Sequence, residues 1–268
     1  MMNTDRRIPD LFSIEVRERY LDLVSRHWPG IPKPEPTELL SSWIHRLAIA
    51  NGVSPFSFGS MLGLESGTST ARLDLRLPGG LTIFLSRQTG IPRKAIAAMS
   101  LDSWALKPLL LPLRFKGKRG FSTWLQYCPE CLATDELPYF RSHWRLATRI
   151  SCFVHGSGLR DNCPLCRKGI APFNQRQLTP HYCCAFCGFN FRLSCKMPVT
   201  ASAQRLELAI DTISRSQTGG CPALGIFIAR LRRAPSLLRA FPNRPLTSLS
   251  STARRRCFDW LGEIGGDD

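Results

Sequence analysis

Cys128-Pro-Glu-Cys131, Cys152-Phe-Val-His155, Cys163-Pro-Leu-Cys166 and Cys184-Ala-Phe-Cys187 are four pairs of metal-ligand residues, each with two residues between its members. This spacing lets a tight turn aim both side chains at one tetrahedral centre, and two pairs complete a shell of four ligands. The four pairs therefore predict two zinc ions. Because four protein ligands leave no coordination position for a substrate, both sites are predicted to be structural.

The order of the pairs allows two ways of sharing the ligands. If neighbouring pairs combine, one zinc ion is held by the first and second pairs, and the other by the third and fourth. If alternate pairs combine, the two sites form a cross-brace of the RING type. The link between His155 and Cys163 is longer than a cross-brace normally has, so the sequence favours the sequential arrangement.

The other cysteines and histidines of this region are weaker ligand candidates. Cys183 is an alternative to Cys184, but the two-residue spacing to Cys187 and the glycine at 188 favour Cys184. Three cysteines lack a partner at metal spacing and are predicted to be small buried hydrophobic residues: Cys195, Cys221 and Cys257. Two histidines lie near the pairs but out of register: His143 and His181.

The charge of the chain indicates a polyanionic partner. Its 268 residues carry a formal net charge of +16, from 36 Lys and Arg residues against 20 Asp and Glu residues. Such a charge attracts nucleic acid, and the alternatives are a contribution to solubility or an acidic protein partner. No stretch approaches twenty consecutive apolar residues, and the first ten residues lack the apolar segment of a signal peptide. The sequence therefore predicts a cytoplasmic protein without membrane contact, in which the high number of cysteines, eleven, is better explained by metal ligation than by disulfides.

Helical spacing begins after the proline-rich segment 31–36. A helix is predicted from Glu38, with Thr37 as its cap, and Asn51-Gly52 is a typical helix end. Ser54-Pro55 then predicts a second short helix through residue 61. Two polar side chains of the first helix, His45 and Arg46, are candidates for an outward face. A packed amphipathic helix is the simpler interpretation.

Residues 81–101 have the pattern of helix, turn and helix. Gly90 permits the turn, Pro92 suits the start of the second helix, and Ile96 and Met99 are its expected buried positions. In a DNA-binding unit the early residues of the second helix contact DNA, and two packed helices with a solvated basic face are the equally simple alternative. The nucleic-acid candidates are Arg93 and Lys94 in this helix and Lys116, Lys118 and Arg119 in the loop that follows.

The predicted fold class is mainly α with small zinc-stabilised modules. We expect an N-terminal, helix-turn-helix-like domain over residues 1–120, a tandem zinc-binding domain over 121–197 and a helical region over 198–268. In the last region, apolar spacing predicts helices over 203–216 and 224–240. The arginines at 254–256 suggest either a further nucleic-acid surface or a helical cap on the zinc domain.

Several motifs taken together resemble one family. They are Ser42-Trp43-Ile-His-Arg46-Leu47-Ala48-Ile-Ala-Asn51-Gly52, Tyr127-Cys128-Pro129-Glu-Cys131-Leu132, Pro138-Tyr139-Phe-Arg141, Trp144, and the ligand pairs with Leu159 and Gly188. In this order, over roughly residues 34–191, the chain resembles the TniQ/TnsD target-selection proteins of transposons. The resemblance implies that Trp43, Arg46, Leu47, Asn51 and Gly52 match the family's N-terminal signature, and that the eight Cys and His ligands match its tandem zinc positions.

The resemblance also implies a function without catalysis. Members of the resembled family are bacterial adaptors that recognise a target, either an attachment-site DNA or a CRISPR effector complex with its guide RNA. They then recruit an AAA+ ATPase regulator and the transposase. A homodimer is a further candidate assembly. This chain stops soon after residue 256, earlier than the longer DNA-reading members, which favours the adaptor role. The alternatives are a stand-alone sequence-specific transcription regulator and a RING-like ligase, and the ligase would require cross-braced zinc.

Overall fold

The structure, a computed structural model, describes residues 27–64, 72–113, 124–172, 175–216, 222–237 and 244–264. Within these ranges the protein is mainly helical, contains isolated β-bridges and forms no strand, which confirms the predicted fold class. The α-helices are α1 (Leu40–Ala50), α2 (Pro55–Met61), α4 (Gly79–Thr89), α5 (Arg93–Ala98), α6 (Pro129–Thr134), α7 (Ala201–Ser216), α8 (Pro222–Arg233) and α9 (Ser251–Ile264). The 3-10 helices are η2 (Lys107–Leu109), η4 (Ser142–Arg145), η6 (Phe191–Leu193), η7 (Ala234–Leu237) and η8 (Leu246–Ser248).

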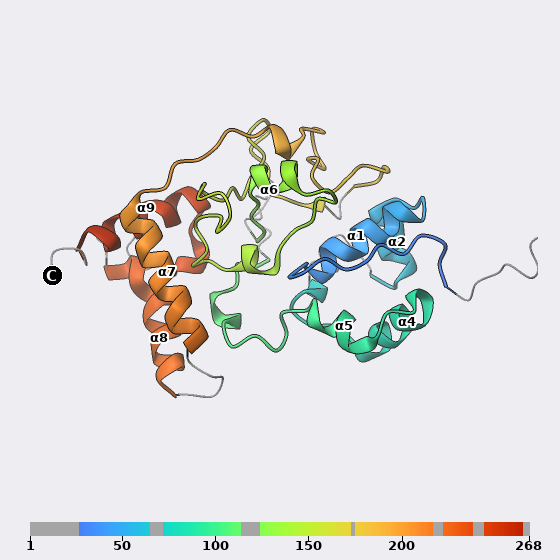
Figure 1. Cartoon of the computed structure of the whole chain (residues 1–268), viewed down its shortest axis with the longest axis horizontal. Coiled ribbons are helices and arrows are strands. Elements are labelled where there is room, and N and C mark those ends of the chain that lie inside the picture. Colours follow the sequence, from blue (N-terminus) through green and yellow to red (C-terminus); the bar gives the residue numbers. More distant parts are fainter. Residues whose placement is uncertain are drawn as a thin grey trace, which may run out of the picture.

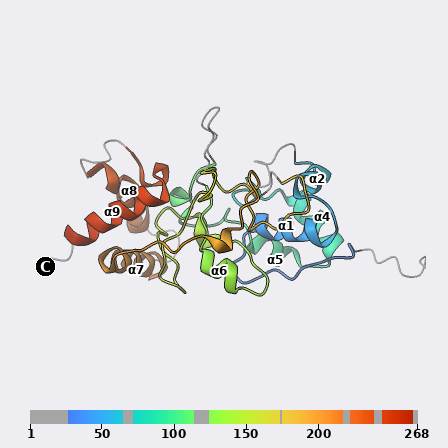
Figure 2. The same ribbon diagram turned by 90° about the horizontal axis from the view of Figure 1, so that it is seen from above.

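The helices form two groups that flank an irregular centre. Helices α1, α2, α4 and α5 lie at one end of the molecule and α7, α8 and α9 at the other, while the loops around α6 occupy the middle (Figure 1). The view from above keeps this order (Figure 2). None of the described helices is both long and apolar enough to span a lipid bilayer.

Helix α1 is the centre of the first group and is buried on almost every side. Its apolar residues pack against Phe58 of α2, Leu85 of α4 and Ile96 of α5. His45, a candidate for the outward face, is 1% exposed and contacts the carbonyl oxygen of Thr179 at 3.1 Å from Nε2. His45 therefore does not face outward, and the simpler interpretation of a packed amphipathic helix applies to it, because α1 is covered by the second half of the chain as well as by its own group.

The signature residues of α1 hold the extended segment that precedes the helix. Trp43 Nε1 donates to the carbonyl oxygen of Pro32 at 2.9 Å, and Arg46 donates to that of Lys33 at 3.2 Å. Asn51 pairs with Gly30 in both directions, at 2.6 Å and 3.1 Å. These side chains satisfy backbone groups of a segment without secondary structure, which explains why a helix of this kind needs those residue types at that spacing.

The start of α1 differs from the prediction. Thr37 has a left-handed backbone with φ 60° and lies outside the helix, which begins at Leu40. The Glu38 carboxylate instead accepts hydrogen bonds from Ser42 Oγ at 2.8 Å and from Arg46 at 2.7 Å. The predicted threonine cap is therefore not formed, and the residue at the cap position makes no side-chain hydrogen bond to the first turn of α1. The end at Asn51 and the second helix, with Ser54 accepting from the amide of Ser57, agree with the prediction.

Residues 81–101 form two helices joined by a left-handed glycine. Gly90 has φ 69° and follows the last turn of α4, as a glycine at a helix end commonly does. Ile96 and Met99 are buried, whereas Phe84, an expected apolar position, is 41% exposed. Helix α5 is only six residues long.

Buried arginines join the C-terminal helices to the centre of the molecule. Arg254 donates to Gln126 Oε1 at 2.9 Å, and Asp161 accepts from the amide and hydroxyl of Ser251 at the start of α9. Arg149 binds Glu207 and Asp211 of α7 at 3.0 Å and 2.8 Å. The arginines at 254 and 255 are buried and attach a helical cap to the metal-ligand region, whereas Arg256 is exposed.

His45 makes the contact between α1 and the second half of the chain sensitive to pH. Burial lowers the pKa of His45 to about 4, and its ring lies 5.3 Å from that of the equally buried His181, whose pKa burial also lowers. Both rings are neutral in the folded chain and bind protons more readily when it unfolds. Their contribution to stability is complete above pH 6.5 and is lost as the pH falls towards 4.

We expect the free energy of unfolding to drop by about 1–2 kcal/mol per histidine between pH 7.5 and 5.5. Chemical denaturation at both pH values measures this, with His45→Phe as the comparison. The phenylalanine variant should show the smaller drop, and an equal drop in both proteins would contradict the assignment. Acid release of metal affects both proteins and cancels in the comparison.

Candidate metal centres

The structure brings the eight predicted ligands together in two groups of four. The first group is Cys128, Cys131, Cys152 and His155, and the second is Cys163, Cys166, Cys184 and Cys187; within each group the ligand atoms lie within 4.8 Å of one another. This is the sequential arrangement, in which neighbouring pairs combine. The cross-braced arrangement is not formed, so the RING-like interpretation lacks the geometry that it requires.

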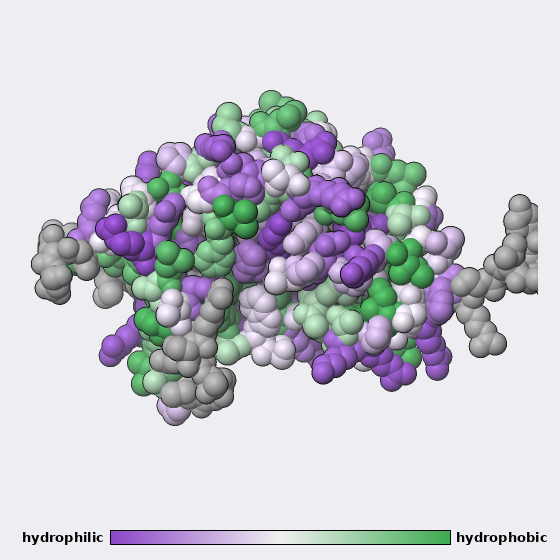
Figure 3. Space-filling view, in the orientation of Figure 1, coloured by the Kyte–Doolittle hydropathy of each residue, from purple (hydrophilic) through white to green (hydrophobic). Residues whose placement is uncertain are grey.

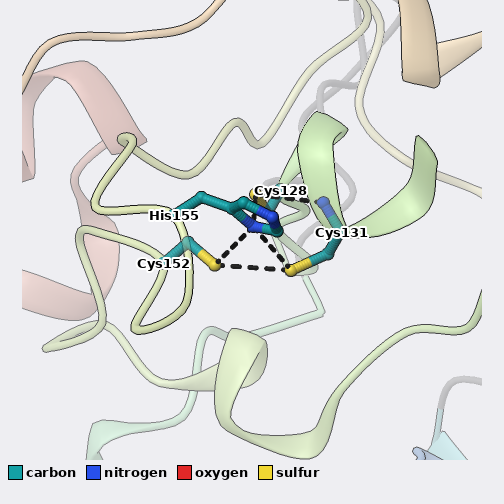
Figure 4. Close-up of side chains that lie close together, drawn as sticks. All are labelled: Cys128, Cys131, Cys152 and His155. Atoms are coloured by element: carbon teal, nitrogen blue, oxygen red, sulfur yellow. Dashed lines mark hydrogen bonds between the residues drawn. The ribbon is translucent and has the colours of Figure 1, made fainter. Parts of the chain in front are cut away.

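The first cluster fits a tetrahedral metal ion. Its three sulfur atoms lie 3.7, 3.4 and 3.6 Å from Nδ1 of His155, and two of them, from Cys131 and Cys152, lie 3.4 Å apart (Figure 4). A zinc ion with Zn–S bonds of about 2.3 Å and a Zn–N bond of about 2.0 Å would separate sulfur from nitrogen by about 3.5 Å. All four side chains point to one centre in Figure 4, and the three cysteines are at most 3% exposed.

The second cluster has the same spacing with four sulfur ligands. Cys163 lies 3.6 Å from Cys187, and Cys166 lies 3.6 Å from Cys184, between Sγ atoms. Cys184 and not Cys183 belongs to the cluster. This cluster is less shielded than the first, because Cys166 is half-buried and Cys187 is exposed.

The chemistry of the second cluster also favours a cation. Burial raises the pKa of Cys163 and of Cys184, so these thiols hold their protons more tightly than free cysteine does. A divalent cation supplies the opposite charge that four neighbouring sulfurs need in order to ionise. Four thiolates, or three with one imidazole, form the donor set of structural zinc sites, and both clusters therefore fit zinc.

Three of the four ligand pairs are carried by the same tight turn. In each turn the amide of the first ligand donates to a carbonyl oxygen five residues later, at 2.8 Å, as from Cys152 to Ser157. The residue directly after the second ligand has a left-handed backbone. This residue is Gly156 in the first turn, with φ 64°, and Gly188 in the third, with φ 73°, but Arg167 in the second, with φ 61°.

The first ligand pair is different because it opens a helix. Cys128 occupies the cap position of α6, and its Sγ accepts from the amide of Cys131 at 3.5 Å. Pro129 at the first helical position is already fixed in a helical φ. The tips of the other turns are apolar and exposed, including Val154 and Leu165. In the space-filling view, hydrophobic side chains lie at the top of the molecule, above α6, among hydrophilic ones (Figure 3).

The predicted nucleic-acid residues are only partly described. Arg93 and Lys94 are exposed on α5. Lys116, Lys118 and Arg119 lie outside the described residues, as does Cys221. Of the other cysteines, Cys257 is buried as predicted, whereas Cys195 is exposed and the prediction for it was wrong.

Two buried polar contacts near the clusters were not predicted. His181 was classed only as out of register, and it packs against His45 and Phe140. Arg145 and Asp74 form an ion pair at 3.1 Å with both side chains fully buried. Each contact joins residues far apart in the chain, so no local spacing could indicate it.

Fold and clusters together define a class: helical proteins built around closed, four-ligand metal modules of a structural type. Residues 29–159 match the model of the TniQ family, which confirms the resemblance over this part of the chain. The TniQ domain supports a transposition-associated adaptor role. The match includes the first cluster and ends at Leu159, before the second. The chain matches no curated protein.

Proposed function

We propose that the chain is a non-enzymatic target-selection adaptor for DNA transposition. It would connect a target, either a DNA site or a CRISPR effector complex with its guide RNA, to the AAA+ ATPase regulator and the transposase. The observation that carries this proposal is the TniQ domain over residues 29–159. Two closed four-ligand clusters support it, because they stabilise a binding scaffold and leave no open coordination position for catalysis.

The proposal divides the chain into three parts with different roles. The N-terminal part, 1–120, contains the α4–α5 unit, the central part, 121–197, would hold two zinc ions, and the C-terminal part, 198–268, contains α7, α8 and α9. This division stays a prediction. Buried ion pairs between the parts, such as Arg149 with Glu207, support a scaffold that acts as one body.

The direct test is reconstituted transposition with an AAA+ ATPase regulator and a transposase of the proposed system. With the chain present, insertions should concentrate at one target, and without it they should be rare or scattered. The purified chain alone should neither cut nor join DNA. An unchanged insertion pattern without the chain would contradict the adaptor function.

The contact with DNA is proposed to include the exposed face of α5. Replacing Arg93 and Lys94 together by alanine should leave the fold intact, because both side chains are exposed. The variant should lower the slope of log affinity against log salt by about 1–2, since each phosphate contact contributes about 0.9. Binding to DNA fragments across a salt series measures the slope, and an unchanged slope would remove α5 from the interface.

A further inference from the structure

A strongly biased stretch of sequence surrounds the second cluster. From residue 162 to residue 206 the chain contains no Asp or Glu, whereas it contains Arg167, Lys168, Arg176, Arg192, Lys196 and Arg205. Four thiolates leave two negative charges around one Zn²⁺, and these cations outnumber them. The segment 162–206, which contains the second cluster, therefore has a net positive charge. Elsewhere in the chain, basic residues such as Arg145 and Arg254 are neutralised by buried ion pairs.

A groove of about 350 Å³ opens beside this cluster. It is lined by the side chains of Arg176 and Phe186 together with Gln177, Thr179 and the turn at Gly188. Lys168 places its ammonium group 4.4 Å from the centre of the Phe186 ring, so it stands at the same groove. Arg176 stacks on Phe56 of α2 at 4.9 Å. We call the basic groove the surface formed by Arg176 and Phe186, by Lys168 beside the Phe186 ring, and by Arg167, which neighbours Lys168 in the chain.

The cations of the basic groove have no anionic partner in the part of the chain that the structure describes. Arg167, Lys168 and Arg176 are exposed and form no ion pair with a described carboxylate. In the same module, Lys196 is paired with Glu130 at 2.5 Å. The groove thus combines free cations, amide and hydroxyl groups and a partly exposed aromatic ring, which suits a phosphodiester backbone.

Arg167 adds an independent reason to assign a ligand to this turn. It occupies the left-handed position that Gly156 and Gly188 occupy in the two equivalent turns. A side chain in this conformation costs about 1 kcal/mol that glycine does not. Folding alone would therefore favour glycine at residue 167, and the arginine is retained at a cost to stability.

We propose that the basic groove binds the phosphodiester backbone of a nucleic acid, with Arg167, Lys168 and Arg176 as the phosphate contacts. This surface is separate from α5 and lies outside the matched TniQ domain. It rests on the proposed function only in that the chain acts on nucleic acid. An adaptor with two such surfaces would grip the nucleic acid at two points and thereby fix its orientation.

The sharpest test uses Arg167→Gly, because the substitution removes strain as well as the cation. Thermal stability should stay equal or increase, whereas the salt slope of binding should fall by about one and the affinity several-fold near 0.1 M salt. Lys168→Ala with Arg176→Ala should lower the slope by about two. Arg232→Ala on α8 is the matched control, since it removes one exposed arginine at the other end of the molecule.

Duplex DNA, single-stranded DNA and RNA of equal length are the probes, and the one that loses most affinity identifies the bound form. If the wild type binds and both groove variants bind equally well, the basic groove is not a nucleic-acid contact. The proposed function would then depend on the α5 contact alone. An equal loss in Arg232→Ala would also overturn the groove contact, as a general charge effect. Wild-type binding to polyglutamate but to none of the nucleic acids would overturn both proposals in favour of an acidic protein partner.

Discussion

Replacing Cys128 by serine is expected to remove one of two zinc ions and to unfold the centre of the chain. Cys128 lies in the first cluster, within 3.7 Å of the ligand nitrogen of His155, and is fully buried. Zinc binding at a structural site contributes about 10–16 kcal/mol in peptide modules, which equals or exceeds the whole stability of a typical domain. The loss of one thiolate therefore removes more free energy than the fold can spare.

Zinc content per chain and thermal unfolding measure this effect. The wild type should contain two zinc ions, and Cys128→Ser should contain one at most and lose its cooperative transition. Cys163→Ser should act in the same way on the second cluster. Cys195→Ser is the control, because Cys195 is exposed and outside both clusters, and it should keep both ions. Full zinc content with a normal transition in Cys128→Ser would disprove the metal assignment.

The parts of the structure that the sequence predicted depend on short-range patterns. The ligand pairs are local, since each needs only a turn of a few residues, and the length of the link between His155 and Cys163 was enough to favour sequential clusters. The end of α1 at Asn51 and the start of α2 at Ser54 follow from the conformational preferences of Asn, Gly, Ser and Pro. Gly90 marks the turn between α4 and α5 for the same reason.

The parts that the sequence left open depend on contacts between distant residues. His45 has the spacing of a solvent-facing residue of α1, and only the packing of residues 179–181 onto that face buries it. Arg254 stands in a run of three arginines that looks like a surface charge cluster. It is buried because Gln126 and Asp161, more than ninety residues earlier, supply its partners. Periodicity describes one element at a time and cannot show what covers it.

The same distinction applies to the candidate binding surfaces. Arg93 and Lys94 were found from helical spacing, whereas the basic groove needs the fold to bring Phe56, Arg176 and Phe186 together. One signal in the sequence did exist. Arg167 stands where the two equivalent turns have glycine, and aligning the three turns with one another would have shown it.

Replacing Arg145 by methionine is expected to destabilise the protein by about 3–5 kcal/mol, because it leaves a carboxylate buried without its cation. Arg145 donates to Asp74 at 3.1 Å and to the carbonyl oxygen of Leu111 at 3.2 Å, and its guanidinium lies 4.7 Å from the ring of Trp124. Asp74 also accepts from the amide and hydroxyl of Ser41 at 2.8 Å and 2.7 Å. The pair therefore joins α1 to the central region through groups that water cannot reach.

The pH dependence identifies the cause of this loss. Burial raises the pKa of Asp74 to about 6 even with Arg145 beside it, and without the arginine it must rise further. A carboxyl whose pKa is raised on folding favours the folded state at low pH, so the deficit of Arg145→Met should be largest near pH 8 and shrink towards pH 5.5. Adding Asp74→Asn should restore part of the stability, because the double variant buries no unpaired charge.

Urea denaturation at the two pH values gives these free energies. Lys107→Met is the matched control: its partner Asp102 forms an ion pair at 2.6 Å, but both side chains are about half exposed. That variant should lose at most about 1 kcal/mol, with little change between pH 8 and 5.5. An Arg145→Met deficit that is equally small, or that stays constant with pH, would show that the buried pair does not hold the two regions together.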